Sequence, residues 1–486
     1  MADRNERTPL LQQRYSDVGE SRTVLRLDDF PGDDPREWPR RKKLANVAVI
    51  AGMAVLSPLV SSMFTPGISQ IADDLNTSTT AVIGTTTGFV VMLGIGPLFL
   101  APLSETFGRR RIYMTCFSIF ALLQIPTALA PNIAFLIAVR SIAGFFGSVG
   151  IANGGGTISD MFVPTERAGV FGWYLLGPLL GPTLGPLFGG IIIQRLGWRW
   201  VFWIMTIVCT VNTLAGYFFL RETYVPAILA AKKAELEKET AEWDGSKYSY
   251  EGEDTSSMRR KIFRALTRPV KIFAQPIVAT MAVYQALVFG TMYSIFTNMQ
   301  PIYGEEGYGF DTEKVGLLYL APGLGSLTAV WFLVPRIDTV YKRLTERNNG
   351  KAKPEFRLPL ANIGAVLLPI SLFWFAWTVE KQVHWFASIS STFFYGIGQV
   401  MILNTTQNYY IDSFEKYAAS AIAAGTVFRS LVGGVIPLLM PALFDNVGYG
   451  WGISTFAFVS LILAPAPMLF FMYGERIRER FMIELE

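Results

Sequence analysis

Twelve apolar segments, each long enough to cross a lipid bilayer, constrain the fold of this chain more than any other feature. A bilayer core of about 30 Å takes about 20 helical residues, and none of the segments shows the alternation of a transmembrane strand, which excludes an outer-membrane barrel. Only 16% of the residues are charged, against about 25% in soluble domains. We therefore predict an all-α membrane protein with spans near 44–65, 79–102, 112–130, 133–157, 168–193, 199–220, 272–297, 314–335, 358–378, 384–405, 417–440 and 451–473.

The positive charges predict how these spans are oriented. With the amino terminus in the cytoplasm, the inward loops and flanks hold thirty Lys and Arg residues and the outward loops hold four. This bias places both termini in the cytoplasm. The net charge of +4 then reflects topology, and nucleic acid is not expected as a partner.

A long polar loop after the sixth span divides the chain into two six-helix bundles. Acid and arginine residues follow both the second span, in Pro102–Arg111, and the eighth, in Pro335–Asp338, as in a transporter built from repeats. The predicted parts are a disordered cytoplasmic tail at 1–37, bundles at 38–220 and 272–474, a cytoplasmic central loop at 221–271, and a cytoplasmic carboxyl-terminal tail at 475–486.

Two short segments outside the spans carry specific patterns. Glu6–Leu11 has the form of an acidic dileucine sorting signal, which is either a signal or plain disordered tail, because short motifs often match by chance. Ala227–Trp243 is predicted as an amphipathic helix lying along the membrane surface.

Glycines recur every fourth residue within the fifth apolar segment. Residues four apart share one face of a helix, so another backbone can approach this face closely. The stripe indicates either a tight helix crossing or a pliable helix at the interface between moving halves, and the other motifs favour the second. The residues are Gly177, Pro178, Gly181, Pro182, Gly185 and Gly189.

Three ordered motifs resemble the major facilitator superfamily, in the form of the fungal twelve-helix drug:proton antiporter family. Ala101–Tyr113 resembles its loop signature, Arg140–Gly144 its fourth-helix arginine motif, and Gly177–Gly190 its fifth-helix antiporter motif. The resemblance implies the fold of that superfamily, alternating access, and a charged latch that closes the cytoplasmic side. The latch residues are Glu105, Gly108, Arg109 and Arg110, with Asp160 and Glu166 as plausible partners.

Two arginines, Arg140 and Arg429, lie deep within predicted spans. A charge at the bilayer centre costs at least about 2.5–3.5 kcal/mol, so a functional role is the default interpretation. Arg140 matches the position that the resemblance links to proton coupling, and a structural ion pair or carbonyl contact is the alternative for both. No Asp or Glu sits in the middle of a span, which favours neutral or anionic cargo and leaves Asp160 among the peripheral proton carriers.

Polar residues on the helices that line the cavity of the implied fold are candidates for substrate contact. Amide and hydroxyl groups in hydrocarbon need partners, which either an aqueous cavity or a neighbouring helix supplies. The candidates are Ser61, Tyr284, Gln285, Tyr293, Asn298, Tyr395, Gln399 and Asn404.

These patterns predict a monomeric secondary transporter that exports small organic molecules, in exchange for protons, from the cytoplasm. The alternatives are a dedicated exporter of an organic acid such as itaconate or citrate, or of a secondary metabolite, and a broad multidrug pump. An enzyme is disfavoured, because His384 is the only histidine and no Gly-x-Ser-x-Gly signature occurs. No metal or other cofactor is expected. The plasma membrane is the predicted location, with the vacuolar or endosomal membrane as the alternative.

Overall fold

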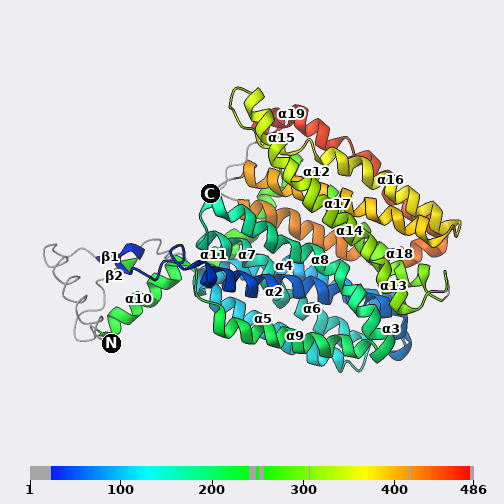
Figure 1. Cartoon of the computed structure of the whole chain (residues 1–486), viewed down its shortest axis with the longest axis horizontal. Helices are drawn as coiled ribbons and strands as arrows, with labels where there is room; N and C mark the ends of the chain where they lie inside the picture. The colour runs from blue at the N-terminus through cyan, green and yellow to red at the C-terminus, as the bar shows by residue number, and fades with distance from the viewer. Residues whose placement is uncertain (1–22, 240–247, 251–256, 306, 415–417, 482–486) are drawn as a thin grey trace.

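In a computed structural model that describes residues 23–239, 248–250, 257–305, 307–414 and 418–481, the chain forms two helical bundles side by side (Figure 1). The first bundle comprises α2 (Arg40–Ser62), α3 (Ile68–Asp74), α4 (Thr79–Phe107), α5 (Arg109–Ala128), α6 (Ile133–Gly147), α7 (Val149–Met161), α8 (Pro164–Leu196) and α9 (Trp198–Phe219). The second comprises α12 (Pro276–Tyr303), α13 (Thr312–Leu318), α14 (Leu320–Thr328), α15 (Val334–Arg347), α16 (Ala361–Glu380), α17 (Trp385–Ser413), α18 (Ala418–Leu463) and α19 (Ala466–Arg480).

The described helices account for the twelve predicted spans. Eleven helical runs are long and apolar enough to cross a membrane, and one of them covers Ser420–Arg480, a run of 61 residues. A straight helix of that length would measure about 90 Å, three times the bilayer core. Gly448, with φ of +75°, breaks this run, so it supplies the last two spans.

Single glycines make the sharpest turns in the first bundle. Gly108, with φ of +94°, alone separates α4 from α5, and Gly197, with φ of +88°, alone separates α8 from α9. A left-handed backbone at a one-residue link favours glycine, which has no Cβ to clash. We call the end with Gly108, α10 (Val225–Glu239) and α11 (Met258–Phe273) the basic end, and the end with α3, Gly197 and α13 the opposite end.

The amino-terminal segment pairs with the central loop, which corrects two predictions. Within the predicted disordered tail, β1 (Thr23–Leu25) forms a parallel pair with β2 (Tyr248–Tyr250), and Asp33 pairs with Lys232 of α10 at 3.4 Å. Tail residues 23–37 are therefore ordered, because partners far along the chain supply their contacts. The predicted helix forms as α10, but its predicted placement along the membrane surface is wrong, since α10 projects away from the bundles (Figure 1). Glu6–Leu11 lies outside the described residues.

A break in the first span leaves helix carbonyls without backbone partners. The chain leaves α2 at Ser62, and α3 begins six residues later, after a short 3₁₀ turn that contains Pro66. Proline cannot donate a backbone hydrogen bond, and the last carbonyls of any helix lack intrahelical donors. The end of α2 is therefore an electronegative point within the membrane-spanning region.

Candidate functional site

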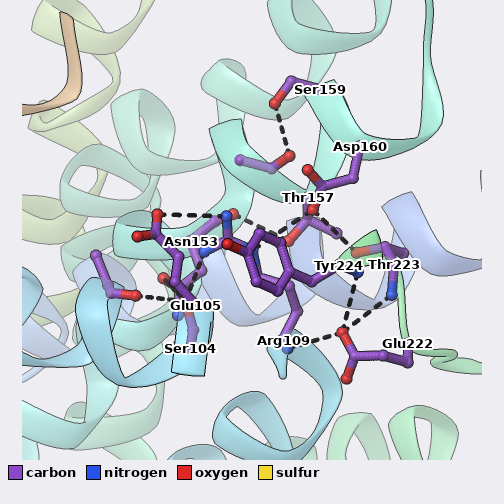
Figure 2. A network of polar contacts seen from close by, with 12 residues as sticks. Ser104, Glu105, Arg109, Asn153, Thr157, Ser159, Asp160, Glu222, Thr223 and Tyr224 are labelled. Carbon is purple, nitrogen blue, oxygen red and sulfur yellow. Dashed lines mark hydrogen bonds and ion pairs between the residues drawn. The ribbon is translucent and has the colours of Figure 1, made fainter. Parts of the chain in front are cut away.

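Arg109 joins three helices of the first bundle at the basic end (Figure 2). Its Nη1 donates to the hydroxyl of Ser104 at 2.6 Å, its Nε donates to Asp160 Oδ2 at 3.5 Å, and Glu105 lies 3.7 Å from its Nη2. Asn153 on α7 extends this Arg109 network by accepting from Ser104 at 3.0 Å. Three predicted latch residues, Glu105, Arg109 and Asp160, are thus brought together.

Glu222, which sequence reasoning did not single out, holds the turn that precedes α5. Its carboxylate accepts from the backbone N–H of Arg109 at 2.8 Å and of Arg110 at 3.1 Å. A Cβ at Gly108 would lie 2.5 Å from Glu222 Oε2, so a side chain there would displace the carboxylate from these N–H groups, and the positive φ of Gly108 also favours glycine. The only sequence feature that could have indicated this role is the position of Glu222, an acidic residue directly after the sixth span at the same end of the bundle as the arginine loop. Two further N–H groups donate to the same carboxylate at 3.1 Å, those of Thr223 and Tyr224.

We expect Glu222→Gln to destabilise the protein by about 1–3 kcal/mol, because a charged acceptor of several buried N–H groups is replaced by a neutral amide that carries its own donors. The change should lower the thermal unfolding midpoint in detergent. Glu166→Gln is the matched control, since Glu166 is exposed and accepts no hydrogen bond from Arg109 or Arg110 among the described residues. Equal midpoints for the two variants would contradict the capping role.

The Arg109 network lies within the first bundle. Its described partners come from α4, α7 and the segment that follows α9. Arg110 donates to the carbonyl of Tyr217 on α9 at 3.2 Å, and Glu166 is exposed at the start of α8 rather than paired with the loop. In this conformation the predicted latch residues bind helices of one half together, and no described contact of the network reaches the second bundle.

A second network occupies the matching place in the second bundle. Arg357, before α16, pairs with Asp338 on α15 and donates to Asp412 on α17 at 2.6 Å. Burial opposes the charge of Arg357, but the carboxylates of Asp412 and Asp338 outweigh it and raise its pKa. Arg109 and Arg357 therefore link corresponding helices of the two halves, as the internal repeat predicts.

Arg140 is a buried cation among aromatic rings and helix carbonyls. It is 1% exposed, and its Nη2 lies 3.4 Å from the carbonyl oxygens of Val60 and Ser61 at the broken end of α2. Its Nε and Nη1 have no described partner. The contacts with carbonyls agree with the alternative that Arg140 has a structural role. The two nitrogens without partners are free to bind an anion, as a functional role requires. Its Cζ stands 4.2, 5.0 and 5.4 Å from the ring centres of Phe64, Phe89 and Phe202.

Tyr293 links the two arginines across the bundles. Its hydroxyl lies 3.1 Å from that of Ser61 on α2, so the pair forms a buried hydrogen bond between the first and second bundles. On one side of this pair the Ser61 carbonyl lies 3.4 Å from Arg140 Nη2, and on the other the Tyr293 ring lies 5.0 Å from that of Phe289. Arg429 stands over Phe289 at 4.7 Å and its Nε has no described partner. Four predicted site residues from four helices thus form one group, which we call the central group: Ser61, Arg140, Tyr293 and Arg429.

The glycine stripe contacts its own bundle, which corrects its predicted place at the moving interface. A Cβ at Gly181 would lie 2.9 Å from Pro58, and one at Gly185 would lie 2.7 Å from the carbonyl oxygen of Leu59. Gly177 and Gly189 face Val55 and Met63 in the same way, so the four glycines form the tight crossing between α8 and α2.

The interface with the second bundle is made by another face of α8. A Cβ at Gly190 would lie 2.7 Å from the carbonyl oxygen of Thr312, and one at Gly316 would lie 2.8 Å from that of Pro186. Thr183 meets Gly323 on α14 in the same way. This face closes the two bundles against each other at the opposite end, where Arg195 pairs with Glu313 at 3.1 Å.

The remaining cavity candidates divide between neighbour contacts and open polar groups. Tyr395 donates to the carbonyl of Val288 at 2.6 Å, Gln399 donates to Met292 Sδ at 2.9 Å, and Asn404 bonds within its own helix. The Tyr395 and Gln399 contacts join α17 to α12, whereas the Asn404 contact stays within α17.

Asn298 and Tyr284 lie inside the second bundle. Asn298 lines a small space together with Phe375 of α16 and Met440 of α18, and it donates to the carbonyl of Ser294 in its own helix at 2.7 Å. Tyr284 is fully buried near Ser460 of α18. Its hydroxyl has no described partner, and neither has the buried Nε2 of Gln285, which lies close to Gly425.

Both the sequence and the fold of this chain are similar to those of known membrane transporters. A sequence model described as Major Facilitator Superfamily matches residues 50–437. The MFS transporter cpaT of Aspergillus oryzae is 40% identical over 93% of this chain and 91% of that protein, and the efflux pump radE of Floropilus chiversii is 38% identical over 94% and 86%. The solved inward-open xylose transporter XylE from E. coli superposes with a TM-score of 0.66 at 12% identity, covering 88% of this chain and 96% of that one, a likeness of fold.

Proposed function

The chain belongs to the major facilitator superfamily, a family of transporters and not of enzymes, and we propose that it exports small neutral or anionic organic molecules in exchange for protons. Export is supported by relatives whose names describe efflux pumps, radE of Floropilus chiversii and vrtL of Penicillium aethiopicum. The excess of basic residues at the basic end, which the positive-inside rule assigns to the cytoplasm, gives the orientation of the chain in this proposal.

The central group carries the proposal on substrate class. The Ser61–Tyr293 hydrogen bond connects the surroundings of two cations, Arg140 and Arg429, and neither arginine has an ion pair with a carboxylate among the described residues. A buried charge without a counter-ion is costly in a membrane, so an anionic or strongly polar substrate would stabilise the site. A polycation would instead meet repulsion.

Proton exchange is the second part of the proposal. Arg140 is the residue that couples substrate binding to proton exchange, since an anion or hydrogen-bond acceptor bound at its unpaired Nε and Nη1 would compete with the carbonyls of α2 for the guanidinium group. Asp160 is the carboxylate proposed to exchange the proton, because it is half-buried against Arg109 at the basic end. The two bundles at 38–220 and 272–474 then rock about the central group, as in other transporters with repeats.

A proton-driven exporter of anions makes a definite prediction for inside-out vesicles prepared from yeast that expresses the chain. Vesicles with an acidic interior should accumulate radiolabelled itaconate or citrate, or else a neutral drug such as fluconazole, well above vesicles from cells without the protein. A protonophore should abolish the accumulation, because the proton gradient drives it.

Comparing organic acids, neutral drugs and the polycation spermidine as cargo distinguishes a dedicated exporter from a multidrug pump and tests the proposed substrate class. Accumulation of one acid alone supports a dedicated exporter, and accumulation of several unrelated drugs supports a multidrug pump. Uptake that the protonophore leaves unchanged would overturn proton exchange, and preference for spermidine would overturn the substrate class. Immunolocalisation in the same cells tests the proposed plasma-membrane location against the vacuolar or endosomal one.

A further inference from the structure

The short helix before the seventh span is strongly basic. Helix α11 covers Met258–Phe273, and its sequence MRRKIFRALTRPVKIF contains six Lys and Arg residues and no Asp or Glu. It ends at Phe273, and α12 begins at Pro276, so two residues connect it to a membrane-spanning helix. The Gln275 side chain holds this corner by donating to the carbonyl of Phe481 at 3.3 Å. Helix α11 is therefore fixed at the level where the bilayer ends.

The two sides of α11 differ in what they contact. On the inner side, Ile272 is fully buried and Phe273 packs against Phe428 of α18, with ring centres 4.9 Å apart. On the outer side, Phe263 is 64% exposed and Val270 is 71% exposed. The residues of this outer side recur at helical spacing. We call it the outer face: Arg259, Arg260, Phe263, Val270 and Lys271, all exposed.

The position of α11 relates it to both bundles. It packs against α18 of the second bundle and against α4 of the first. The same two helices meet directly deeper in the membrane, where the Thr87 hydroxyl of α4 donates to the carbonyl of Gly434 of α18 at 2.6 Å. Helix α11 thus lies across the interface between the halves at the basic end.

We propose that the outer face of α11 binds the headgroups of anionic phospholipids, with Phe263 and Val270 inserted toward the acyl chains. The basic side chains complement the negative surface of a leaflet, and exposed apolar residues beside them are the pattern of helices that lie in the membrane interface. Bound lipid would hold α11 in the interface plane while α4 and α18 separate. The lipid composition would then bias the alternation between conformations, whatever the cargo.

The test compares purified full-length protein in detergent with and without added phospholipid. Phosphatidylserine should raise the thermal unfolding midpoint and phosphatidylcholine should not, because only a ligand that prefers the folded protein stabilises it. The triple variant Arg259→Gln, Arg260→Gln, Lys271→Gln should bind phosphatidylserine about 100-fold more weakly, at about fivefold for each of the three charges removed near the surface.

The matched control neutralises three exposed basic residues on α15, by Lys342→Gln, Arg343→Gln and Arg347→Gln, and should keep the phosphatidylserine effect. An unchanged effect in the α11 variant would overturn the proposal, as would equal loss in both variants, which would indicate net charge alone. The midpoint needs no transported substrate, so failure of the proposed export activity would leave this result interpretable.

Discussion

Arg140→Ala should reduce proton-driven accumulation at least about 100-fold while the protein remains folded in the membrane. The variant removes one of the two cations of the central group, so a bound anion would lose a buried charged partner, a loss of about 3–5 kcal/mol or a factor of more than about 100 in an equilibrium. The carbonyls of Val60 and Ser61 lose a donor at the same time. The measurement is accumulation of the anion that wild-type inside-out vesicles take up, normalised to protein in the membrane.

Two further variants make the Arg140 result specific. Arg140→Lys keeps the charge and loses the planar fork, so it should retain partial transport if charge matters most. Arg199→Ala removes an exposed arginine that pairs with Asp74 at the opposite end, and it should transport normally. Full transport by Arg140→Ala would reject the coupling role, and loss of membrane protein in that variant would assign Arg140 to folding instead.

Gly189→Val should prevent the folded state from forming. The carbonyl oxygen of Met63, directly after α2, occupies the place that a Cβ at Gly189 would need. A backbone oxygen cannot rotate away as a side chain can, so α2 and α8 would have to separate and lose the close contacts that join them. We expect a cost above about 4 kcal/mol, at the upper end for a single substitution. Size-exclusion chromatography of a fluorescent fusion in mild detergent should show aggregate instead of a monodisperse peak.

The neighbouring Phe188→Val is the control, because Phe188 is exposed on the same helix and the same β-branched residue is introduced there. It should elute as the wild type does. The comparison also separates the two interpretations of the stripe. A Gly189→Val protein that folds normally and fails only in transport would place the stripe at a moving interface after all.

The two arginines within the spans could be predicted as site residues from the sequence, whereas the neighbour of the glycine stripe could not. Arg140 and Arg429 stand out because a charge inside an apolar span is rare, and the structure connects both to the Ser61–Tyr293 pair, Arg140 through the Ser61 carbonyl and Arg429 through Phe289. The stripe from Gly177 to Gly189 shows the limit. Glycines four residues apart identify a helix face that another backbone can approach closely. Their spacing does not indicate which helix supplies that backbone, and in the structure it is α2.

Glu222 and the β1–β2 pair were out of reach for a related reason. Each owes its role to a partner distant in the chain, the turn at Gly108 for the carboxylate and strand Tyr248–Tyr250 for the tail. Local composition marks such residues only as an acid in a loop and a polar tail.

The sequence by itself determined the membrane-spanning helices, their number and the repeat, because the cost of an unpaired peptide group in hydrocarbon forces each long apolar segment into a helix wherever it packs. Only the tertiary structure decided which faces meet: α2 against the glycines, Ser61 against Tyr293, and α11 across α4 and α18. Those choices depend on side chains that fit together from distant parts of the chain, and a pattern along one helix does not contain its partner.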